Sequence, residues 1–383
     1  MKTINELLPA LVQLRQYLHK IPEIAHKEYK TLEVIRYYMK NLQPDLLLEN
    51  MGKTGLAVVF NGLKPGRTLM FRAELDALPI EEDIDIPYHS AVKTISHKCG
   101  HDGHMTMLYG LASLIAEKRP DKGRIVLLFQ PAEETGTGAE TVLADAQFMQ
   151  IRPDYVFAIH NIPGFSKGSI ILREGIFAMA SEGMQIRLKG IASHVAYPEQ
   201  GISPLPAMMD ILSKLSRFND KKKIFEDYTR LSITFAMLGK YGFGITPGLA
   251  EIGLVLRAIL PKDLEKGQGM IKRTVQKAAM ESYLEEQFIQ CEPFPATFNN
   301  PDVVKRISML ALKNHQELIV PDMPFRWSED FGHFTSRFPG ALIGLGAGTN
   351  QSDLHTWYYD FPDDILEAGI STYYSILKEF IDD

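Results

Sequence analysis

The sequence predicts an α/β fold in which a mostly parallel sheet is flanked by helices, with a smaller α+β module inserted into it. Short, nearly continuous apolar runs alternate with helical stretches up to residue 178, which is typical of parallel strands buried on both faces. Between residues 182 and 190, polar and apolar side chains alternate instead, as in a strand with one face in water. After Cys291 the first pattern returns.

Two sequence patterns define the elements of the first stretch. Apolar residues at three- and four-residue steps predict helices, and short apolar runs bounded by glycine, proline or asparagine predict strands. In chain order the predicted elements are helices over 5–19 and 28–42, strands over 56–60 and 68–72, a helix over 104–118, a strand over 125–129, a helix near 137–149 and a strand over 155–159.

The inserted module is predicted to span residues 179–291. Its order of strand, helix, two strands and helix suits a small α+β unit. Its predicted elements are a strand over 182–190, a helix over 203–218, strands over 230–238 and 250–258, and a helix over 262–285. Residues 1–178 and 292–383 then form the larger domain, which is completed by a helix over 301–314, a strand near 341–345 and a helix over 363–381.

Composition narrows the range of partners. The chain has 383 residues and a net charge of −6, which gives no electrostatic reason to expect nucleic acid or an anionic membrane as a partner. Two cysteines do not indicate a disulfide framework. Segment 1–20 does not resemble a signal peptide, and no apolar run is long enough to span a bilayer. We therefore expect a cytoplasmic protein in which Cys99 stays reduced.

Two short segments concentrate metal-binding side chains. Residues 98–104 contain a thiol, two imidazoles and a carboxylate, and the adjacent acids Glu133 and Glu134 follow the predicted strand at 125–129. Thiolate, imidazole and carboxylate groups bind Zn²⁺ and its first-row neighbours. A second, unliganded glutamate beside such a site is what metal-assisted hydrolysis needs to move protons.

Each of these groups has another interpretation when it is taken alone. A loop cysteine can be buried and inert, acids in the first turn of a helix suit its dipole, and a histidine after an apolar strand can be a hydrogen-bonded core residue. Their shared position favours a site, because Glu74, Glu133, Glu134 and His160 all follow predicted strand ends. In open α/β sheets, ligands bind outside the carboxyl ends of the strands.

Seven segments occur in an order that is found in one enzyme superfamily. They are HKIPE (19–23), RAELDALPI (72–80), HKCGHDGH (97–104), QPAEE (130–134), SHVAYP (193–198), SEDF (328–331), and His355 followed by YDF (359–361). In these segments the chain resembles the M20 metallopeptidase superfamily. It is most similar to the amidohydrolase branch that cleaves N-acyl amino acids, which includes hippurate, auxin-conjugate and N-acetyl-diaminopimelate hydrolases.

The resemblance implies a zinc-peptidase-like catalytic domain with an inserted lid or dimerisation domain. It implies a general base at Glu133, which takes a proton from water and later gives it to the leaving amine. Asp76 is implied to orient a ligand histidine, and His194 in the insert to stabilise the oxyanion. Two divalent ions, bridged by the cysteine, are implied to be held by Cys99, His101, Glu134, His160 and His355.

The chain departs from the family pattern at three places. Glu74 stands where the family usually has aspartate, Trp357 replaces a smaller residue beside the last ligand, and residues 244–247 read Gly-Ile-Thr-Pro instead of Asn-x-Ile-Pro. The missing asparagine removes a group that is expected to face the substrate. Arg257, on a following predicted strand, is a candidate partner for a substrate carboxylate or else an ordinary strand-edge cation.

The predicted function is metal-dependent hydrolysis of the amide bond in N-acyl amino acids. A dipeptidase or aminoacylase with the same site is the first alternative. A metal-binding protein without catalytic activity is the second, and the intact Glu133 and His194 argue against it. Zinc is the expected metal because a thiolate favours softer ions, with manganese, cobalt and nickel as alternatives. The resemblance further implies a small-molecule substrate and a homodimer formed through the inserted domain.

Overall fold

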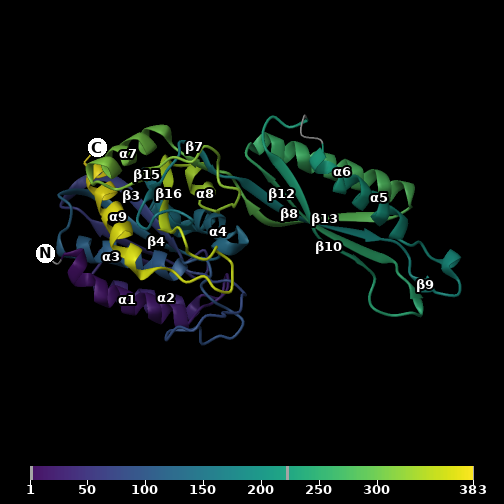
Figure 1. Cartoon of the computed structure of the whole chain (residues 1–383), viewed down its shortest axis with the longest axis horizontal. Coiled ribbons are helices and arrows are strands. Elements are labelled where there is room, and N and C mark those ends of the chain that lie inside the picture. The colour runs from purple at the N-terminus through teal and green to yellow at the C-terminus, as the bar shows by residue number, and fades with distance from the viewer. Residues whose placement is uncertain (1–2, 221–223, 383) are drawn as a thin grey trace. The chain divides into compact units, whose positions relative to one another are not determined.

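The computed structural model describes residues 3–220 and 224–382, which form two compact units (Figure 1). The first contains the described residues of 1–177, 297–324 and 329–383, and the second those of 178–296 and 325–328. The sequence-based boundaries placed 178, 292–296 and 325–328 in the larger domain. Residues 325–328 join the second unit because Phe325 forms a β-bridge with Ala178, and its carbonyl accepts a hydrogen bond of 3.1 Å from the backbone N–H of Met179.

An eight-stranded sheet forms the centre of the first unit. In spatial order its strands are β1 (Leu46–Met51), β2 (Gly55–Asn61), β4 (Lys122–Gln130), β3 (Lys64–Glu74), β5 (Tyr155–Pro163), β16 (Gly340–Gly348), β6 (Ile170–Ile171) and β15 (Leu318–Ile319). The four middle strands, β4, β3, β5 and β16, are parallel, whereas β1, β2 and β4 pair antiparallel. The predicted mostly parallel sheet is confirmed.

The extent of burial explains which strands could be predicted from the sequence. Every residue from Ile125 to Gln130 of β4 is buried, so this strand appears in the sequence as an uninterrupted apolar run ending in one polar residue. The short strands β6 and β15 have no such run, and neither they nor β1 were predicted. β4 lies between β2 and β3, although the turn at 61–66 joins β2 and β3 in the chain.

Helices cover both faces of this sheet. One face shares a large apolar core with α1 (Ile4–Lys20), α2 (Tyr29–Lys40), α3 (His101–Glu117), α7 (Pro301–Lys313) and α9 (Leu366–Phe380). Figure 1 shows α9 beside α3 along this layer. α4 (Gly138–Ala144) contacts β4 and α8 (Gly332–Thr335), and its buried side chains are not part of that core. The predicted helix over 104–118 begins earlier, so that His101 lies in its first turn.

The second unit is an antiparallel sheet with two helices on one face. Its strands, in spatial order, are β10 (Thr229–Leu238), β12 (Leu249–Ala258), β8 (Ala180–Lys189) and β13 (Glu285–Phe294). α5 (Leu205–Ser216) and α6 (Pro261–Glu281) share an apolar core with this sheet. A short ladder in this unit pairs β9 (Ser193–His194) with β11 (Ile245–Thr246). A second short ladder, of β7 (Gly175–Ala178) with β14 (Thr297–Asn299), belongs to the first unit except for Ala178. No helix within 3–220 or 224–382 is long and apolar enough to cross a membrane.

Candidate metal centre

The carboxyl ends of the parallel strands gather the predicted site residues of the first unit. β4 ends at Gln130, three residues before Glu133, and β5 carries His160 near its end. The segment after β16 carries His355, whose backbone N–H donates a 2.8 Å hydrogen bond to the carbonyl of Lys98. This bond joins the segment of His355 to the loop of Cys99.

The thiol of Cys99 lies at the centre of these groups. Its Sγ is 3.4 Å from Nε2 of His160 and 3.4 Å from Nε2 of His355. Ligand atoms of Cys99, His101 and His160 lie within 4.8 Å of one another, and so do those of Cys99, Glu134 and His355. The sulfur therefore belongs to two groups of possible metal ligands.

The chemistry of the donor set fits a metal ion. Nδ1 of His101 pairs with the backbone carbonyl of Asp76 at 2.8 Å, which leaves Nε2 facing Oε1 of Glu134 at 3.8 Å. Both of these atoms are buried, and neither has a hydrogen-bond partner among the described residues. Two ligands bound about 2.1 Å from one tetrahedral ion lie about 3.4 Å apart. The spacing is thus close to that of ligands on a shared cation.

The site favours positive charge. Burial raises the pKa of Glu134 to about 8, and burial followed by repulsion from Glu134 and Glu133 raises that of the Cys99 thiol. Burial acts to lower the pKa of His101, but its hydrogen bond to Asp76 and the nearby carboxylates raise it to about 10. Burial lowers the pKa of His160, which keeps this imidazole neutral. A divalent cation beside these groups would favour their deprotonated forms, which are the forms that bind metal.

Asp76 holds the Glu133-Glu134 turn in place. Its Oδ1 accepts a hydrogen bond of 3.1 Å from the backbone N–H of Glu133, and its Oδ2 accepts one of 3.0 Å from that of Glu134. The resemblance to the M20 superfamily implied that this carboxylate orients a ligand histidine. In the structure, its Oδ1 lies 3.7 Å from Nδ1 of His101, while the shorter contact to that ring is made by the backbone carbonyl.

Strained backbone accompanies the site. Ala132 has a φ of 53° immediately before Glu133, and His355 has a φ of 61°. Residues other than glycine rarely adopt this left-handed region, and such outliers cluster at functional sites. Gly100, between Cys99 and His101, has a φ of 94°, and a Cβ there would lie 2.4 Å from Oδ1 of Asn161.

A buried cluster around Glu133 was not predicted from the sequence. The backbone N–H of Asp330 donates to Oε1 of Glu133 at 3.4 Å. The Asp330 carboxylate accepts hydrogen bonds from Nη2 of Arg72 at 2.7 Å and from Nε2 of Gln130 at 2.8 Å. Asp330 and Glu329 lie in a segment that was quoted only for its resemblance. An arginine in the buried half of β3 was the signal for this cluster, because it needs buried acids as partners.

Glu74 and His104 form a supporting pair. Nδ1 of His104 lies 2.7 Å from Oε2 of Glu74, and its Nε2 lies 2.5 Å from Oδ1 of Asn161. Arg72 also donates to Glu74. Because both ring nitrogens of His104 contact protein oxygens, this imidazole is not arranged as a metal ligand. The glutamate that departs from the family pattern thus reaches His104 and Arg72.

The remaining predicted residues do not join this cluster within the first unit. His194 and Arg257 lie in the second unit, on β9 and β12, and His194 is exposed. Residues 244–247 lie there too, and β11 within them pairs with β9. Trp357 lies in the first unit and is 57% exposed. Its carbonyl accepts a 3.1 Å hydrogen bond from the N–H of Asp83.

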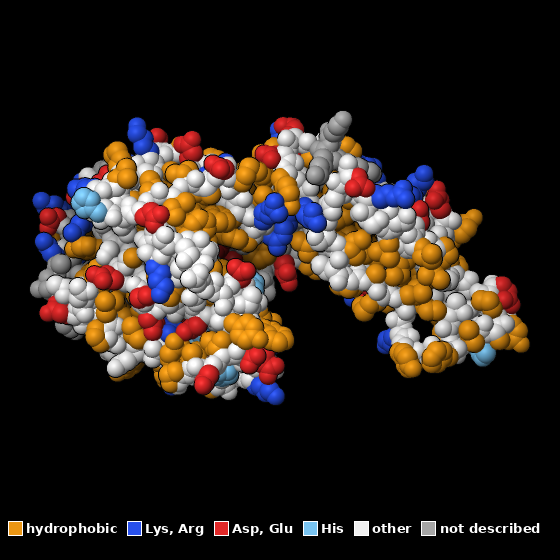
Figure 2. Space-filling model, viewed as in Figure 1, with side chains coloured by type: hydrophobic (Ala, Val, Ile, Leu, Met, Phe, Trp, Pro, Cys, Tyr) orange, Lys and Arg blue, Asp and Glu red, His pale blue; other side chains and the backbone are white. Residues whose placement is uncertain are grey.

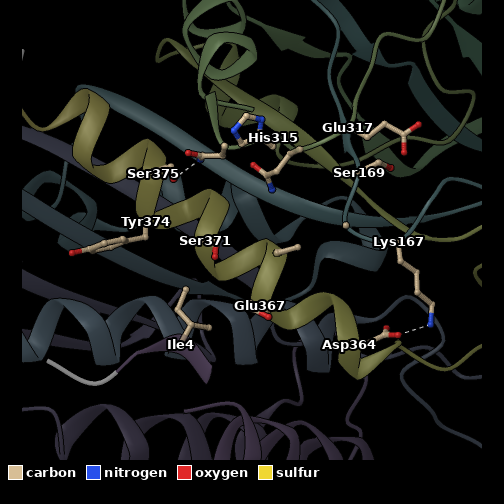
Figure 3. Close-up of a pocket in the computed structure, with 14 residues that line it drawn as sticks. Ile4, Lys167, Ser169, His315, Glu317, Asp364, Glu367, Ser371, Tyr374 and Ser375 are labelled. Carbon is tan, nitrogen blue, oxygen red and sulfur yellow. Dashed lines mark hydrogen bonds and ion pairs between the residues drawn. The ribbon is translucent and has the colours of Figure 1, made fainter. Parts of the chain in front are cut away.

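A separate cavity of about 700 Å³ lies elsewhere in the first unit, lined by α9 and residues 314–317 (Figure 3). At its margin Lys167 and Asp364 form an ion pair at 2.6 Å. None of the predicted site residues lines this cavity. It is therefore distinct from the candidate metal centre.

Comparison with known proteins agrees with this geometry. The sequence profile of peptidase family M20/M25/M40 matches residues 70–379. The chain belongs to this family. This M20 protein is 28% identical over 379 residues to N-acetyldiaminopimelate deacetylase of Leuconostoc mesenteroides, covering 96% of this chain and 95% of that one. It is also 28% identical over 375 residues to thermostable carboxypeptidase 1 of Saccharolobus solfataricus, covering 96% and 94%.

Solved structures share the fold. A dinuclear metal-binding M20 peptidase from Bacillus subtilis superposes with a TM-score of 0.80 at 24% identity, covering 98% of this chain and 99% of that one. A putative aminohydrolase from methicillin-resistant Staphylococcus aureus superposes with a TM-score of 0.87 at 24% identity, covering 99% and 98%. The M20 protein is thus a hydrolase of a metal-dependent family, with ligand groups suited to metal in its first unit.

Proposed function

We propose that this M20 protein hydrolyses the amide bond of N-acyl amino acids at a centre of two divalent cations. The proposal rests on one observation. Nε2 of His101 and Oε1 of Glu134 face each other beside the sulfur of Cys99, and both atoms are buried without a hydrogen-bond partner among the described residues. Relatives that are called N-acetyldiaminopimelate deacetylases support the substrate class. The proposed ligands are Cys99, His101, Glu134, His160 and His355.

Cations bound at this centre supply Lewis acidity, which acidifies water and polarises a carbonyl. Glu133 then acts as the general base, taking a proton from the attacking water on its carboxylate and giving it to the leaving amine. Its Oε1 accepts the N–H of Asp330, and its Oε2 lies 4.0 Å from Nε2 of His101. Burial raises the pKa of Glu133 well above its usual range, which suits a group that must hold a proton between two steps.

His194 is proposed to stabilise the oxyanion of the tetrahedral intermediate. The backbone N–H of Ala196 donates to Nδ1 of His194 at 3.1 Å. In the neutral ring the proton therefore resides on Nε2, which makes Nε2 a hydrogen-bond donor. A donor is what a developing negative oxygen requires.

We propose that the protein binds zinc and that it functions in the cytoplasm. A thiolate ligand favours zinc over harder ions, and Cys99 is a free thiol that has to stay reduced to bind one. Metal content after expression in defined media, measured by mass spectrometry, tests the choice of ion. More than one equivalent of manganese with no zinc would contradict it.

A homodimer through the second unit is also proposed. β10 is an edge strand of its sheet, and Ile233, Phe235 and Met237 on it are 38%, 40% and 49% exposed. Figure 2 shows hydrophobic side chains over the part of this unit where Figure 1 labels β10. An exposed apolar edge strand is a template for pairing with a second copy. Light scattering of the wild type and of Met237→Glu tests this, since a wild-type monomer would refute it.

The test of the activity is hydrolysis of a substrate panel by metal-free protein supplemented with each divalent ion. N-acyl amino acids should release free amino acid only with metal, and Glu133→Gln should lower kcat by about a hundredfold or more. Glu140→Gln, at an exposed acid of α4, is the matched control and should keep full activity. Full turnover by Glu133→Gln would refute the assigned base.

The same panel separates the alternatives. Faster turnover of free dipeptides than of N-acyl amino acids would indicate a dipeptidase, and relatives include a carboxypeptidase. Tight binding of two metal ions with no hydrolysis of any amide would indicate a non-catalytic member of the family.

A further inference from the structure

The second unit contains a pocket of about 560 Å³ that is rich in arginine. Its lining residues are Tyr228, Arg230, Ser232, Arg257, Arg326 and Trp327. All six belong to the second unit, and no described acidic residue is among them. The pocket therefore carries three positive charges and no negative one on its walls.

Two of these arginines lie opposite each other on adjacent strands. Arg230 on β10 is the direct register partner of Arg257 on β12. Like charges at directly opposed positions destabilise a pair of strands. Within the described residues neither arginine has an ion-pair partner, so no carboxylate of these residues offsets the repulsion.

A cation–π contact of the third arginine, Arg326, and two hydrogen bonds of Arg257 fix the positions of these side chains. The guanidinium carbon of Arg326 lies 4.9 Å from the centre of the Tyr228 ring. Nη1 of Arg257 donates to the carbonyl of Arg326 and to Oγ of Ser328, both at 3.0 Å. Its other N–H groups have no partner in the described part of the chain. Burial lowers the pKa of Arg257, so this cation is partly desolvated without a compensating acid.

We infer that this pocket binds a small organic anion that carries two carboxylates. Arginine presents paired N–H donors that match the geometry of a carboxylate, and three guanidinium groups exceed what a single carboxylate engages. The rings of Tyr228 and Trp327 offer apolar surface for the carbon skeleton, and Ser232 adds a hydroxyl. A volume of about 560 Å³ lies in the range of small-molecule sites.

Two sources share this chemistry. One is a substrate whose amino-acid part has a second carboxylate, which rests on the proposed function. The other is a separate dicarboxylate that modulates the enzyme. The inference that the pocket binds a dicarboxylate does not depend on which source is correct, because binding can be measured without turnover.

Binding is tested with glutarate, by calorimetry and by the fluorescence change of Trp327, in low-salt buffer on the metal-loaded protein. We expect saturable binding that weakens with added salt. Arg230→Gln and Arg326→Gln should each weaken it by about tenfold or more. Arg273→Gln, which removes an exposed charge on α6 outside the pocket, should leave the affinity unchanged. No binding of glutarate, or equal affinity in all variants, would overturn the inference.

A second readout does not depend on ligand affinity. If repulsion between the opposed arginines is uncompensated, Arg230→Gln should raise the melting temperature in the absence of anion, and glutarate should stabilise only proteins with the intact pocket. The inference rests on repulsion between Arg230 and Arg257 in the absence of anion. A lower melting temperature for Arg230→Gln without anion would contradict this repulsion.

Kinetics then identify the source. If the substrate supplies the anion, Arg230→Gln raises KM for N-acetylglutamate but not for N-acetylleucine, with kcat nearly unchanged. If a separate molecule supplies it, glutarate changes the turnover of N-acetylleucine in the wild type and not in Arg230→Gln. Either kinetic pattern supports the inference that the pocket binds a dicarboxylate.

Discussion

Nε2 of His101 and Oε1 of Glu134 face each other at 3.8 Å, both buried and both without a hydrogen-bond partner among the described residues. A buried polar atom without a partner is costly. A group outside the polypeptide that contacts both atoms would remove this cost. The neighbouring sulfur of Cys99 makes a cation the best candidate.

Metal affinity should increase with pH. In the metal-free site Glu134, with a pKa of about 8, and His101, with a pKa of about 10, hold protons at neutral pH, and so does the Cys99 thiol. Each must lose its proton to bind metal. Affinity should therefore rise by about tenfold per pH unit for each proton released between pH 6 and 8. Competition with a chelator measures this, and an affinity independent of pH would contradict it.

Asp76→Asn should weaken metal binding while the fold persists. The carboxylate accepts the backbone N–H groups of both Glu133 and Glu134, and an amide offers one oxygen where two are needed. Loss of such a supporting group lowers metal affinity by about 10- to 100-fold. Asp85→Asn, at an exposed acid, should bind metal like the wild type. Equal affinity in both variants would show that Asp76 does not hold the turn.

The central sheet and the candidate ligands were predictable for one reason. Parallel strands buried on both faces, such as 125–129, appear in the sequence as uninterrupted apolar runs, and the polar residues that follow them meet at one edge. By this rule Glu133, Glu134 and His160 were expected at that edge, and in the structure they lie after β4 and near the end of β5. Cys99 and His101 were proposed from their ligand types and from the resemblance to the M20 superfamily.

Other parts of the molecule depend on tertiary context. β13 was not predicted: it begins shortly after α6, the predicted helix over 262–285 included its first residue, and no element was predicted for 286–291. Residues 325–328 join the second unit through one β-bridge to Ala178, which no local pattern encodes. The cluster of Arg72, Glu329 and Asp330 forms between residues far apart in the chain, so its partners could not be paired from spacing.

Gly100→Ala should unfold the loop between the first two candidate ligands. A side chain there meets Oδ1 of Asn161 at 2.4 Å and must adopt a φ of 94°. Together these effects should cost about 2 kcal/mol or more of unfolding free energy. Gly242→Ala is the matched control, because its Cβ meets nothing within 4 Å. Denaturant unfolding measures both, and equal stability of the two variants would exclude the clash.

His19 should stabilise the first unit in a pH-dependent way. It is buried between Asp102, 2.7 Å from Nδ1, and Glu82, 2.8 Å from Nε2. Burial acts to lower its pKa, but these two carboxylates raise it from 6.5 to about 9. The folded state therefore holds the proton more tightly than the unfolded chain. This contribution, about 3 kcal/mol, is fully present below pH 6.5 and is lost as the pH rises through 9.

His19→Asn should consequently lower the unfolding free energy much more at pH 6 than at pH 10. Asp102 stands next to His101 in the chain, so the same variant should loosen the start of α3 and weaken metal binding at neutral pH. His315→Asn replaces an exposed histidine and should change stability by less than about 0.5 kcal/mol at either pH. A loss in His19→Asn that is constant from pH 6 to pH 10 would mean that packing, rather than the charged hydrogen bonds to Asp102 and Glu82, is what His19 contributes.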